Sequence, residues 1–477
     1  MPKGRFALSL VLSVSLAACG GGDGGGSGAP PISGGPTPSP TATPPPTSGQ
    51  CSLLERQNWV RQQLEQYYLF PNLLATGVNP ASYSSVQAYI DALVAPARAA
   101  ERDRNFTYIT SIAEENAFFN SGQSAGFGIR LSYANNRLFV TEAFENAPAF
   151  AAGIDRGTEI LSINGQSVSG LFASGGQGAV SQALGPSDAG VQRALRIRDT
   201  SGVEREVSVT KAVYALDPVS DRNGVRIIDD AGKKVGYLNF RTFSIESGAQ
   251  DLRAAFRQFQ QAGVTEVILD LRYNGGGRVS QAELLGSLLG RNLVGQVFSR
   301  TEFRPSLASD NETDLFTAQA EAIGVTKLAI IGTDGTASAS ELVANAFIPY
   351  LGQNIALIGE DTFGKPVGQI AVDRAACDDR LRVVAFRTVN AAGQGDYYSG
   401  LASVFPRTCR ATDDLTRQFG DPQEASIRTA LDFLAGRSCT PIGGTAGVQG
   451  TRSVGQDNVL LRTYNDDPAQ RDVPGLF

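Results

Sequence analysis

The second half of the chain alternates between two hydrophobic periodicities, and this alternation restricts the possible folds most strongly. Helical patterns over residues 247–261 and 338–350 each lie between two apolar runs of strand length. Strands that are apolar throughout and alternate with helices predict an α/β sheet layered with helices. In such folds, chemistry gathers in the loops at strand ends. The four expected strands are 235–240, 266–271, 327–331 and 355–358.

The first half of the folded body follows other patterns. Residues 123–212 show short alternating runs separated by Gly and Asn turns, which is typical of a small β domain. Residues 51–70 and 85–93 carry apolar side chains at roughly helical spacing, which predicts a small helical cap. The fold class expected for the whole chain is therefore multidomain α/β.

The N-terminal segment has the features of an export signal. A basic start and an apolar run over residues 6–16 end in L-A-A-C at Cys19, and the run is too short to span a membrane. The L-A-A-C ending resembles the lipobox of bacterial lipoproteins. This resemblance implies that residues 1–18 are removed and that Cys19 is lipidated. Gly20, which follows Cys19, implies that the lipoprotein is located at the outer membrane. Residues 19–50 are rich in Gly, Pro and Ser and predict a tether without a packed core.

Four further cysteines remain, an even number in a chain expected to reach an oxidising compartment. Cys377 and Cys409 flank a hairpin-like segment, whereas Cys51 and Cys439 lie near the two ends of the folded body. We therefore expect the disulfides Cys377–Cys409 and Cys51–Cys439.

The chain contains no histidine at all. This excludes Ser-His-Asp and Cys-His catalysis and histidine-ligated metal sites. A formal net charge of −6 without blocks of Lys and Arg argues against a nucleic-acid partner. A serine nucleophile in such a chain needs another base, and a lysine held neutral by desolvation is suitable.

Two loops at strand ends hold groups suited to this chemistry. D-L-R-Y-N-G-G-G at residues 270–277 can bring bare N–H groups close to a ligand, although it equally suits a tight turn. T-A-S-A-S-E at residues 336–341 puts Ser338 at a helix start, where the dipole favours negative charge. Ser338 and Glu341 also match a capping box, which needs no catalytic role. Lys365 stands among apolar residues that favour a lowered lysine pKa, with a solvated surface lysine as the alternative.

The β-rich region carries a recognisable segment. A-P-A-F-A-A-G-I-D-R-G-T-E-I-L-S-I-N-G at residues 147–165 resembles a PDZ domain, with Thr158 where that family usually has Asp. PDZ domains bind a peptide as an added strand, and a Gly-rich turn donates N–H groups to its terminal carboxylate. The resemblance implies that this turn consists of Gly126, Phe127, Gly128 and Ile129.

With V-G-Y-L-N-F-R-T-F at residues 235–243 and G-E-D-T-F-G-K at residues 359–365, the two loops resemble those of the C-terminal processing peptidases, also called tail-specific proteases. The match covers most of the chain after the tether. It implies a helical cap over 51–120, a PDZ domain over 121–213, a Ser/Lys peptidase core of α/β, crotonase/ClpP-like type over 214–440 and a C-terminal tail over 441–477.

The resemblance also implies roles for single residues. The chain departs from the family pattern in two ways. Pro366 stands where Gly is usual, and the interval between Ser338 and Lys365 is longer than usual. Counting back from Lys365 by the usual spacing therefore reaches Ser340. The local motif favours Ser338 as nucleophile. No metal or cofactor is required. The implied catalytic set is Ser338 as nucleophile, Lys365 as general base, Gln369 as its orienting partner, and the N–H groups of Gly276 and Ala339 as the oxyanion hole.

The function implied is a serine endopeptidase that cleaves exported proteins bearing apolar C-termini. Its expected place is the bacterial cell envelope, facing the periplasm and held at the outer membrane through lipidated Cys19. Two alternatives remain open: a peptide-binding lipoprotein that has lost proteolysis, suggested by Pro366 and the altered spacing, and a Ser/Lys amidase or esterase acting on envelope material. Residues 458–464 are expected to add an edge strand.

Overall fold

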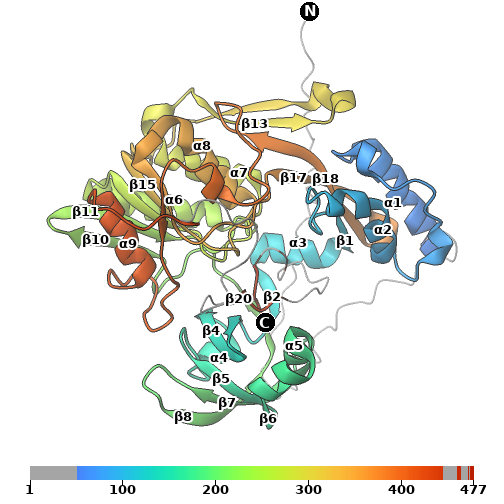
Figure 1. The fold of residues 1–477 in the computed structure, drawn as a ribbon, viewed down its shortest axis with the longest axis horizontal. Coiled ribbons are helices and arrows are strands. Elements are labelled where there is room, and N and C mark those ends of the chain that lie inside the picture. Colours follow the sequence, from blue (N-terminus) through green and yellow to red (C-terminus); the bar gives the residue numbers. More distant parts are fainter. Residues whose placement is uncertain (1–50, 444–458, 463–470, 472) are drawn as a thin grey trace, which may run out of the picture. The chain divides into compact units, whose positions relative to one another are not determined.

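The computed structural model describes residues 51–443, 459–462, 471 and 473–477 (Figure 1). Cys19 and the predicted tether lie outside these residues. Within the described part of the chain, no helix is both long and apolar enough to cross a membrane.

The central element is a six-stranded sheet in the order β10-β11-β12-β15-β16-β19. The β10–β11 pair is antiparallel and the remaining pairs are parallel. This confirms the four strands expected from apolar runs. The strands are β10 (Val225–Asp230), β11 (Lys233–Asn239), β12 (Glu266–Asp270), β15 (Lys327–Gly332), β16 (Ile355–Gly359) and β19 (Thr408–Arg410).

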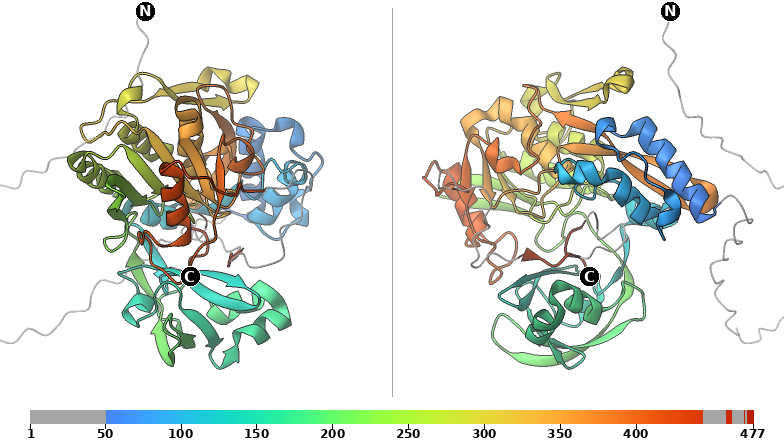
Figure 2. Two further views of the ribbon diagram at one scale, coloured as in Figure 1. Left: turned by 60° about the vertical axis from the view of Figure 1, so that its left-hand side comes forward. Right: turned by 45° about the vertical axis from the view of Figure 1, so that its right-hand side comes forward.

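Helices cover both faces of this sheet, which explains why its central strands carry apolar residues on both faces. Leu328 and Ile330 of β15 pack with α6 (Gly248–Ala262), α7 (Val279–Leu289) and α8 (Ala339–Leu351) in one core. Ala329 and Ile331, which point the other way, pack against α9 (Ala425–Leu434). The same arrangement can be followed from two sides in Figure 2.

A second sheet differs from the expectation of a purely helical cap. Helices α1 (Leu53–Tyr67) and α2 (Val86–Ala99) form as predicted, but they pack on a five-stranded sheet through a shared apolar core. The strand β1 inside the expected cap pairs with β18, more than 260 residues later in the chain. The strands are β1 (Tyr108–Ser111), β13 (Val297–Phe303), β14 (Glu312–Leu315), β17 (Val367–Arg374) and β18 (Asp379–Val389).

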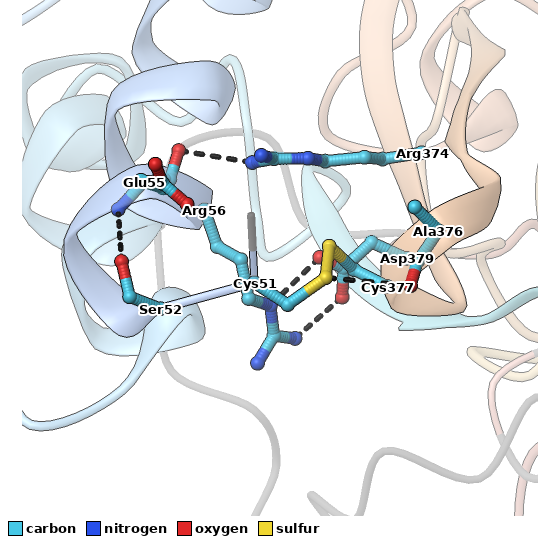
Figure 3. Close-up of a disulfide and its surroundings, with 8 residues drawn as sticks. All are labelled: Cys51, Ser52, Glu55, Arg56, Arg374, Ala376, Cys377 and Asp379. Atoms are coloured by element: carbon cyan, nitrogen blue, oxygen red, sulfur yellow. Dashed lines mark hydrogen bonds and ion pairs between the residues drawn. A yellow bond between two sulfur atoms is a disulfide. The ribbon is translucent and has the colours of Figure 1, made fainter. Parts of the chain in front are cut away.

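Both predicted disulfide pairings are wrong. The structure joins Cys51 to Cys377, with 5.5 Å between their Cα atoms (Figure 3). It joins Cys409 to Cys439, with 5.3 Å between their Cα atoms. Cys377 is not beside the hairpin predicted from sequence but in the turn between β17 and β18, on which α1 packs, so Cys51 lies next to it. Cys409 belongs to β19, and the segment that contains Cys439 returns along that strand, where Arg410 N–H donates to Thr440 O at 2.7 Å.

The β-rich region forms a third structural unit, with strand order β20-β3-β4-β5-β7-β8 and β6 paired to β5. A two-stranded ribbon of β2 and β9 connects it to the rest of the chain, and β20 confirms part of the expected edge strand near residue 460. The elements are α3 (Ile112–Ser121), β2 (Gln123–Gly126), β3 (Ile129–Ala134), β4 (Arg137–Ala143), α4 (Pro148–Ala151), β5 (Glu159–Ile163), β6 (Gln166–Ser167), α5 (Val168–Leu184), β7 (Gln192–Arg198), β8 (Glu204–Thr210), β9 (Ala212–Ala215) and β20 (Val459–Leu460).

Lys211, at the end of this unit, gives the fold a pH dependence. Its ammonium group donates to Gly185 O and Pro186 O and lies 4.6 Å from the Phe127 ring centroid, and burial lowers the pKa of Lys211 to about 8. Between pH 8 and 10.5 the unfolded chain keeps this proton and the folded chain releases it. Stability therefore rises with pH across this window, by roughly 2 kcal/mol.

The measurement is urea unfolding at pH 7, 8, 9 and 10.5 for the wild type and Lys211→Met. We expect the rise to shrink in Lys211→Met and to persist in the control Lys234→Met, whose side chain is exposed. An equal rise in all three proteins would show that Lys211 is not its source.

Candidate active site

One buried carboxylate joins the two loops that hold Ser338 and Lys365. Glu341 is fully buried, and its Oε2 atom accepts the backbone N–H of Ser338 at 2.9 Å and that of Lys365 at 2.7 Å. Its Oε1 atom accepts the Thr362 hydroxyl at 2.6 Å and the Gly364 N–H at 2.7 Å. The backbone N–H groups of Ser338 and Lys365 therefore donate to the same oxygen atom, which holds the two backbones close together.

The electrostatics of Glu341 reflect two opposed effects. Burial raises the pKa of its carboxyl above the ordinary value, because the charged form loses its hydration. The four donors from Thr362, Lys365, Gly364 and Ser338 act in the other direction and stabilise the ionised form. Sequence reasoning recognised Glu341 only as a partner in a capping box. The Ser338 N–H bond does belong to such a box, but the same side chain also holds the loop around Lys365.

Ser338 lies between β15 and α8 in an unusual backbone conformation. Its φ is 56° and its ψ is −114°, a combination that costs a non-glycine residue free energy. The side chain of Ser338 is half-buried, whereas the competing candidate Ser340 is fully buried and donates its hydroxyl to Asn274 O at 2.9 Å. Ser340 thus already has a structural task, joining α8 to the glycine loop.

The glycine loop runs directly against Ser338. A Cβ atom on Gly276 would lie 2.8 Å from Ser338 Cβ and 3.0 Å from Ala339 N, so only glycine allows this approach. Gly276 has φ of 109°, which also favours glycine. The predicted oxyanion residues Gly276 and Ala339 are therefore neighbours. However, the Gly276 N–H donates to Asn274 Oδ1 at 2.9 Å, so here it is engaged within its own loop and not ready to receive an oxyanion.

The start of the glycine loop is fixed by ionic contacts that sequence reasoning did not identify. Arg272 is fully buried and binds Asp270 and Glu424, with 2.9 and 3.0 Å between the closest atoms, and Asp413 at 2.7 Å. Although burial alone would raise it, the charge of Arg272 lowers the pKa of Glu424 to about 2. These contacts anchor the strand end from which the glycines extend.

Lys365 directs its side chain to the partner expected from sequence. Its Nζ atom donates to Gln369 Oε1 at 2.9 Å and lies 4.9 Å from the centroid of the Phe106 ring. The Gln369 amide in turn donates to Phe106 O, which fixes its orientation. Phe106 comes from the segment before β1 and carries no sequence signal of this role, because only the three-dimensional fold brings it here.

The proposed peptide-binding turn belongs to the third unit and not to this site. Gly126 ends β2, Ile129 begins β3, and both Gly128 N–H and Ile129 N–H donate to Phe477 O, at 2.9 and 3.3 Å. Phe127 is fully buried in the apolar core of the unit. Among the described residues, no cluster of three or more acidic or cysteine side chains is arranged to hold a metal ion.

Several known proteins are similar to this chain. Over 250 residues the chain is 28% identical to a carboxyl-terminal-processing protease of Synechocystis sp., covering 51% of this chain and 54% of that protein. Over 258 residues it is 26% identical to the carboxy-terminal processing protease CtpA of Bacillus subtilis, covering 53% and 49%. The matched region thus spans about half the length of these curated relatives.

A solved S41 protease structure from Bacteroides fragilis has a TM-score of 0.63 and 25% sequence identity, covering 79% of this chain and 97% of that one. The profile of peptidase family S41 matches residues 234–397, which include the glycine loop, Ser338, Lys365 and Gln369. Residues 234–397 of this chain therefore form a peptidase family S41 domain.

Proposed function

We propose that the chain is a serine endopeptidase in which Ser338 is the nucleophile and Lys365 the general base. The observation that carries the proposal is the shared oxygen of Glu341, which holds the Ser338 and Lys365 backbones together. The Lys365 amine donates to Gln369 Oε1, which orients it, and lies 4.9 Å from the centroid of the Phe106 ring. In a chain without histidine, this pair supplies both a hydroxyl and a base.

The proposed reaction is acyl transfer through an acyl-enzyme. Neutral Lys365 Nζ accepts the proton of the Ser338 hydroxyl as its oxygen attacks the peptide carbonyl carbon. The resulting oxyanion is stabilised by the N–H groups of Ala339 and Gly276, and Gly276 must first release its bond to Asn274. The proton then passes from Lys365 to the leaving amine as the C–N bond breaks. Water, deprotonated by Lys365, hydrolyses the acyl-enzyme and restores Ser338.

Substrate binding is assigned to the third unit, which we interpret as a PDZ domain. The N–H groups of Gly128 and Ile129 point to one common acceptor, the arrangement with which a PDZ turn binds the end of a peptide. Phe127 and Ile129 of the turn belong to the apolar core of the unit, so the substrates proposed are proteins with apolar C-termini. The L-A-A-C motif at Cys19 supports a place in the bacterial cell envelope, with the protein facing the periplasm and anchored by lipid, at the outer membrane.

The test offers the wild-type protein three kinds of substrate. They are an unfolded protein ending in apolar residues, the same protein ending in Asp residues, and small amides and esters that contain no peptide bond. We expect mass spectrometry to detect peptide-bond cleavage, faster for the apolar tail. Binding of the apolar tail without any cleavage would favour a peptide-binding lipoprotein. Hydrolysis of only the amides or esters would favour the amidase or esterase.

A further inference from the structure

The segment 473–477 of this chain lies along β3 as an additional antiparallel strand. Phe477 N–H donates to Ile129 O at 2.8 Å, Ile129 N–H donates to Phe477 O, and Leu131 N–H donates to Gly475 O at 2.8 Å. Arg130 and Leu476 form an antiparallel bridge within this pairing. In Figures 1 and 2 the end marked C lies at this edge of the third unit. The segment thus uses the backbone groups of β3 that an added peptide strand would need.

The side chains of this segment are as buried as a core. Phe477 is 2% exposed and shares an apolar core with Phe127 and Ile129 of the turn. Leu476, also 2% exposed, packs in a cluster with Phe118 of α3 and Ile245 of the segment before α6. A Cβ atom on Gly126 would lie 2.8 Å from the carbonyl carbon of Phe477, so a side chain at position 126 would exclude Phe477 from this place. The segment is therefore buried against the unit as a bound peptide would be.

A preceding part of the same tail lies against the loops of the candidate active site. Leu460 packs with Tyr273 of the glycine loop, and a Cβ atom on Gly335 would lie 2.7 Å from its side chain. Arg462 donates to Asp334 O at 2.7 Å, and its guanidinium lies 5.1 Å from the Phe363 ring centroid. The tail therefore contacts the loops of both Ser338 and Lys365 as well as the peptide-binding turn.

We propose that residues 473–477 are a built-in ligand of the peptide-binding groove, which competes with substrate tails and keeps the enzyme in a restrained state. The inference rests on the proposed function, because it gives the groove to substrate C-termini. It also defines their chemistry, namely extended peptides that carry two adjacent large apolar residues of the Leu-Phe kind.

Competition follows from the geometry. The N–H groups of Gly128, Ile129 and Leu131 are already donated to the segment, and a second strand cannot accept them at the same time. A tethered ligand also has a high effective concentration, on the order of millimolar, which an external peptide must exceed. Substrate tails therefore bind only when the segment leaves.

The experiment measures binding apart from catalysis. A fluorescent peptide with the sequence of residues 471–477 is titrated against the full chain carrying Ser338→Ala, and anisotropy gives its Kd. Two further substitutions are each added to release the segment. Phe477→Asp puts a charge into the apolar core that this residue shares with Phe127 and Ile129. Gly475→Val adds a side chain at φ 82°, where its Cβ would meet Leu131 O at 3.1 Å. The matched control is Gly443→Val, which has a similar φ of 73° but open space around it.

We expect Phe477→Asp and Gly475→Val to bind the peptide at least about tenfold more tightly than the parent and the Gly443→Val control. With Ser338 restored, the same two variants should cleave an apolar-tailed protein faster. Equal affinities in all four proteins, or no binding by any of them, would overturn the proposal. Tighter binding without cleavage by any protein would refute the peptidase function and leave the built-in ligand standing. Cleavage by all proteins without peptide binding would refute only the built-in ligand.

Discussion

Replacing Ser338 by alanine is expected to lower the rate of peptide cleavage by a factor on the order of 10³ to 10⁶. The reason is that no other described hydroxyl is available in the same position: Ser340 is fully buried and donates to Asn274 O. Lys365→Ala should cause a loss of similar size, because the serine proton then has no acceptor. Cleavage rates from mass spectrometry and the far-UV circular dichroism of each variant separate lost chemistry from lost folding.

Two further variants make this prediction specific. Lys365→Arg should stay inactive up to pH 10, since a guanidinium does not release its proton in this range and therefore cannot act as a general base. Ser340→Ala should cost only about 1 kcal/mol of stability, from one lost hydrogen bond, and should keep most of its activity. Activity lost in Ser340→Ala and kept in Ser338→Ala would transfer the nucleophile to Ser340.

Glu341→Gln is expected to lose both activity and stability. The amide keeps the size of the carboxyl group, but it replaces one acceptor oxygen by an NH₂ group, which cannot accept the hydrogen bonds that this oxygen received. In the wild type, Oε1 accepts from Thr362 and Gly364, and Oε2 accepts from Ser338 and Lys365. At least two donors therefore lose their acceptor in Glu341→Gln. Unsatisfied buried donors cost about 1–3 kcal/mol each, so we expect the free energy of unfolding to fall by about 3 kcal/mol or more. Cleavage should drop at least about 100-fold, because the loops of Ser338 and Lys365 separate.

Chemical denaturation measures the stability change, and single-turnover cleavage measures the catalytic one. Glu246→Gln is the matched control, since its side chain is 70% exposed and should change neither quantity. If Glu341→Gln instead folded and cleaved like the wild type, Glu341 would be a helix cap and no more, as the capping-box alternative has it.

Sequence reasoning succeeded where burial leaves a continuous pattern. The strands β11, β12, β15 and β16 are covered on both faces, so each has a run of apolar residues on both faces and could be recognised without a structure. The sheet built from β1, β13, β14, β17 and β18 was missed because its strands are partly exposed and pair across long stretches of chain. Its contacts depend on the fold of the whole chain and not on any local period.

The same division applies to the site. Local motifs brought out Ser338, Lys365 and Gln369, and the Lys365–Gln369 hydrogen bond agrees with what the resemblance implied. The motifs could not show that Glu341 holds two loops, that Phe106 orients Gln369, or that the Gly276 N–H is engaged by Asn274. Each of these depends on a distance between segments remote in sequence. The disulfide predictions were wrong for the same reason. The position of a cysteine along the chain does not show that α1 packs next to the turn between β17 and β18, where Cys377 lies.

The Cys51–Cys377 bridge has a consequence for how the molecule is made. It connects residues 326 positions apart, and α1, the first helix of the described part to leave the ribosome, packs on β18, which is synthesised far later. Helix α1 must therefore wait, without its partner surface, until most of the polypeptide has been made. The part of the fold that holds Lys365 is therefore assembled late in biogenesis. If Cys51 were oxidised before Cys377 had been synthesised, it could not form this disulfide.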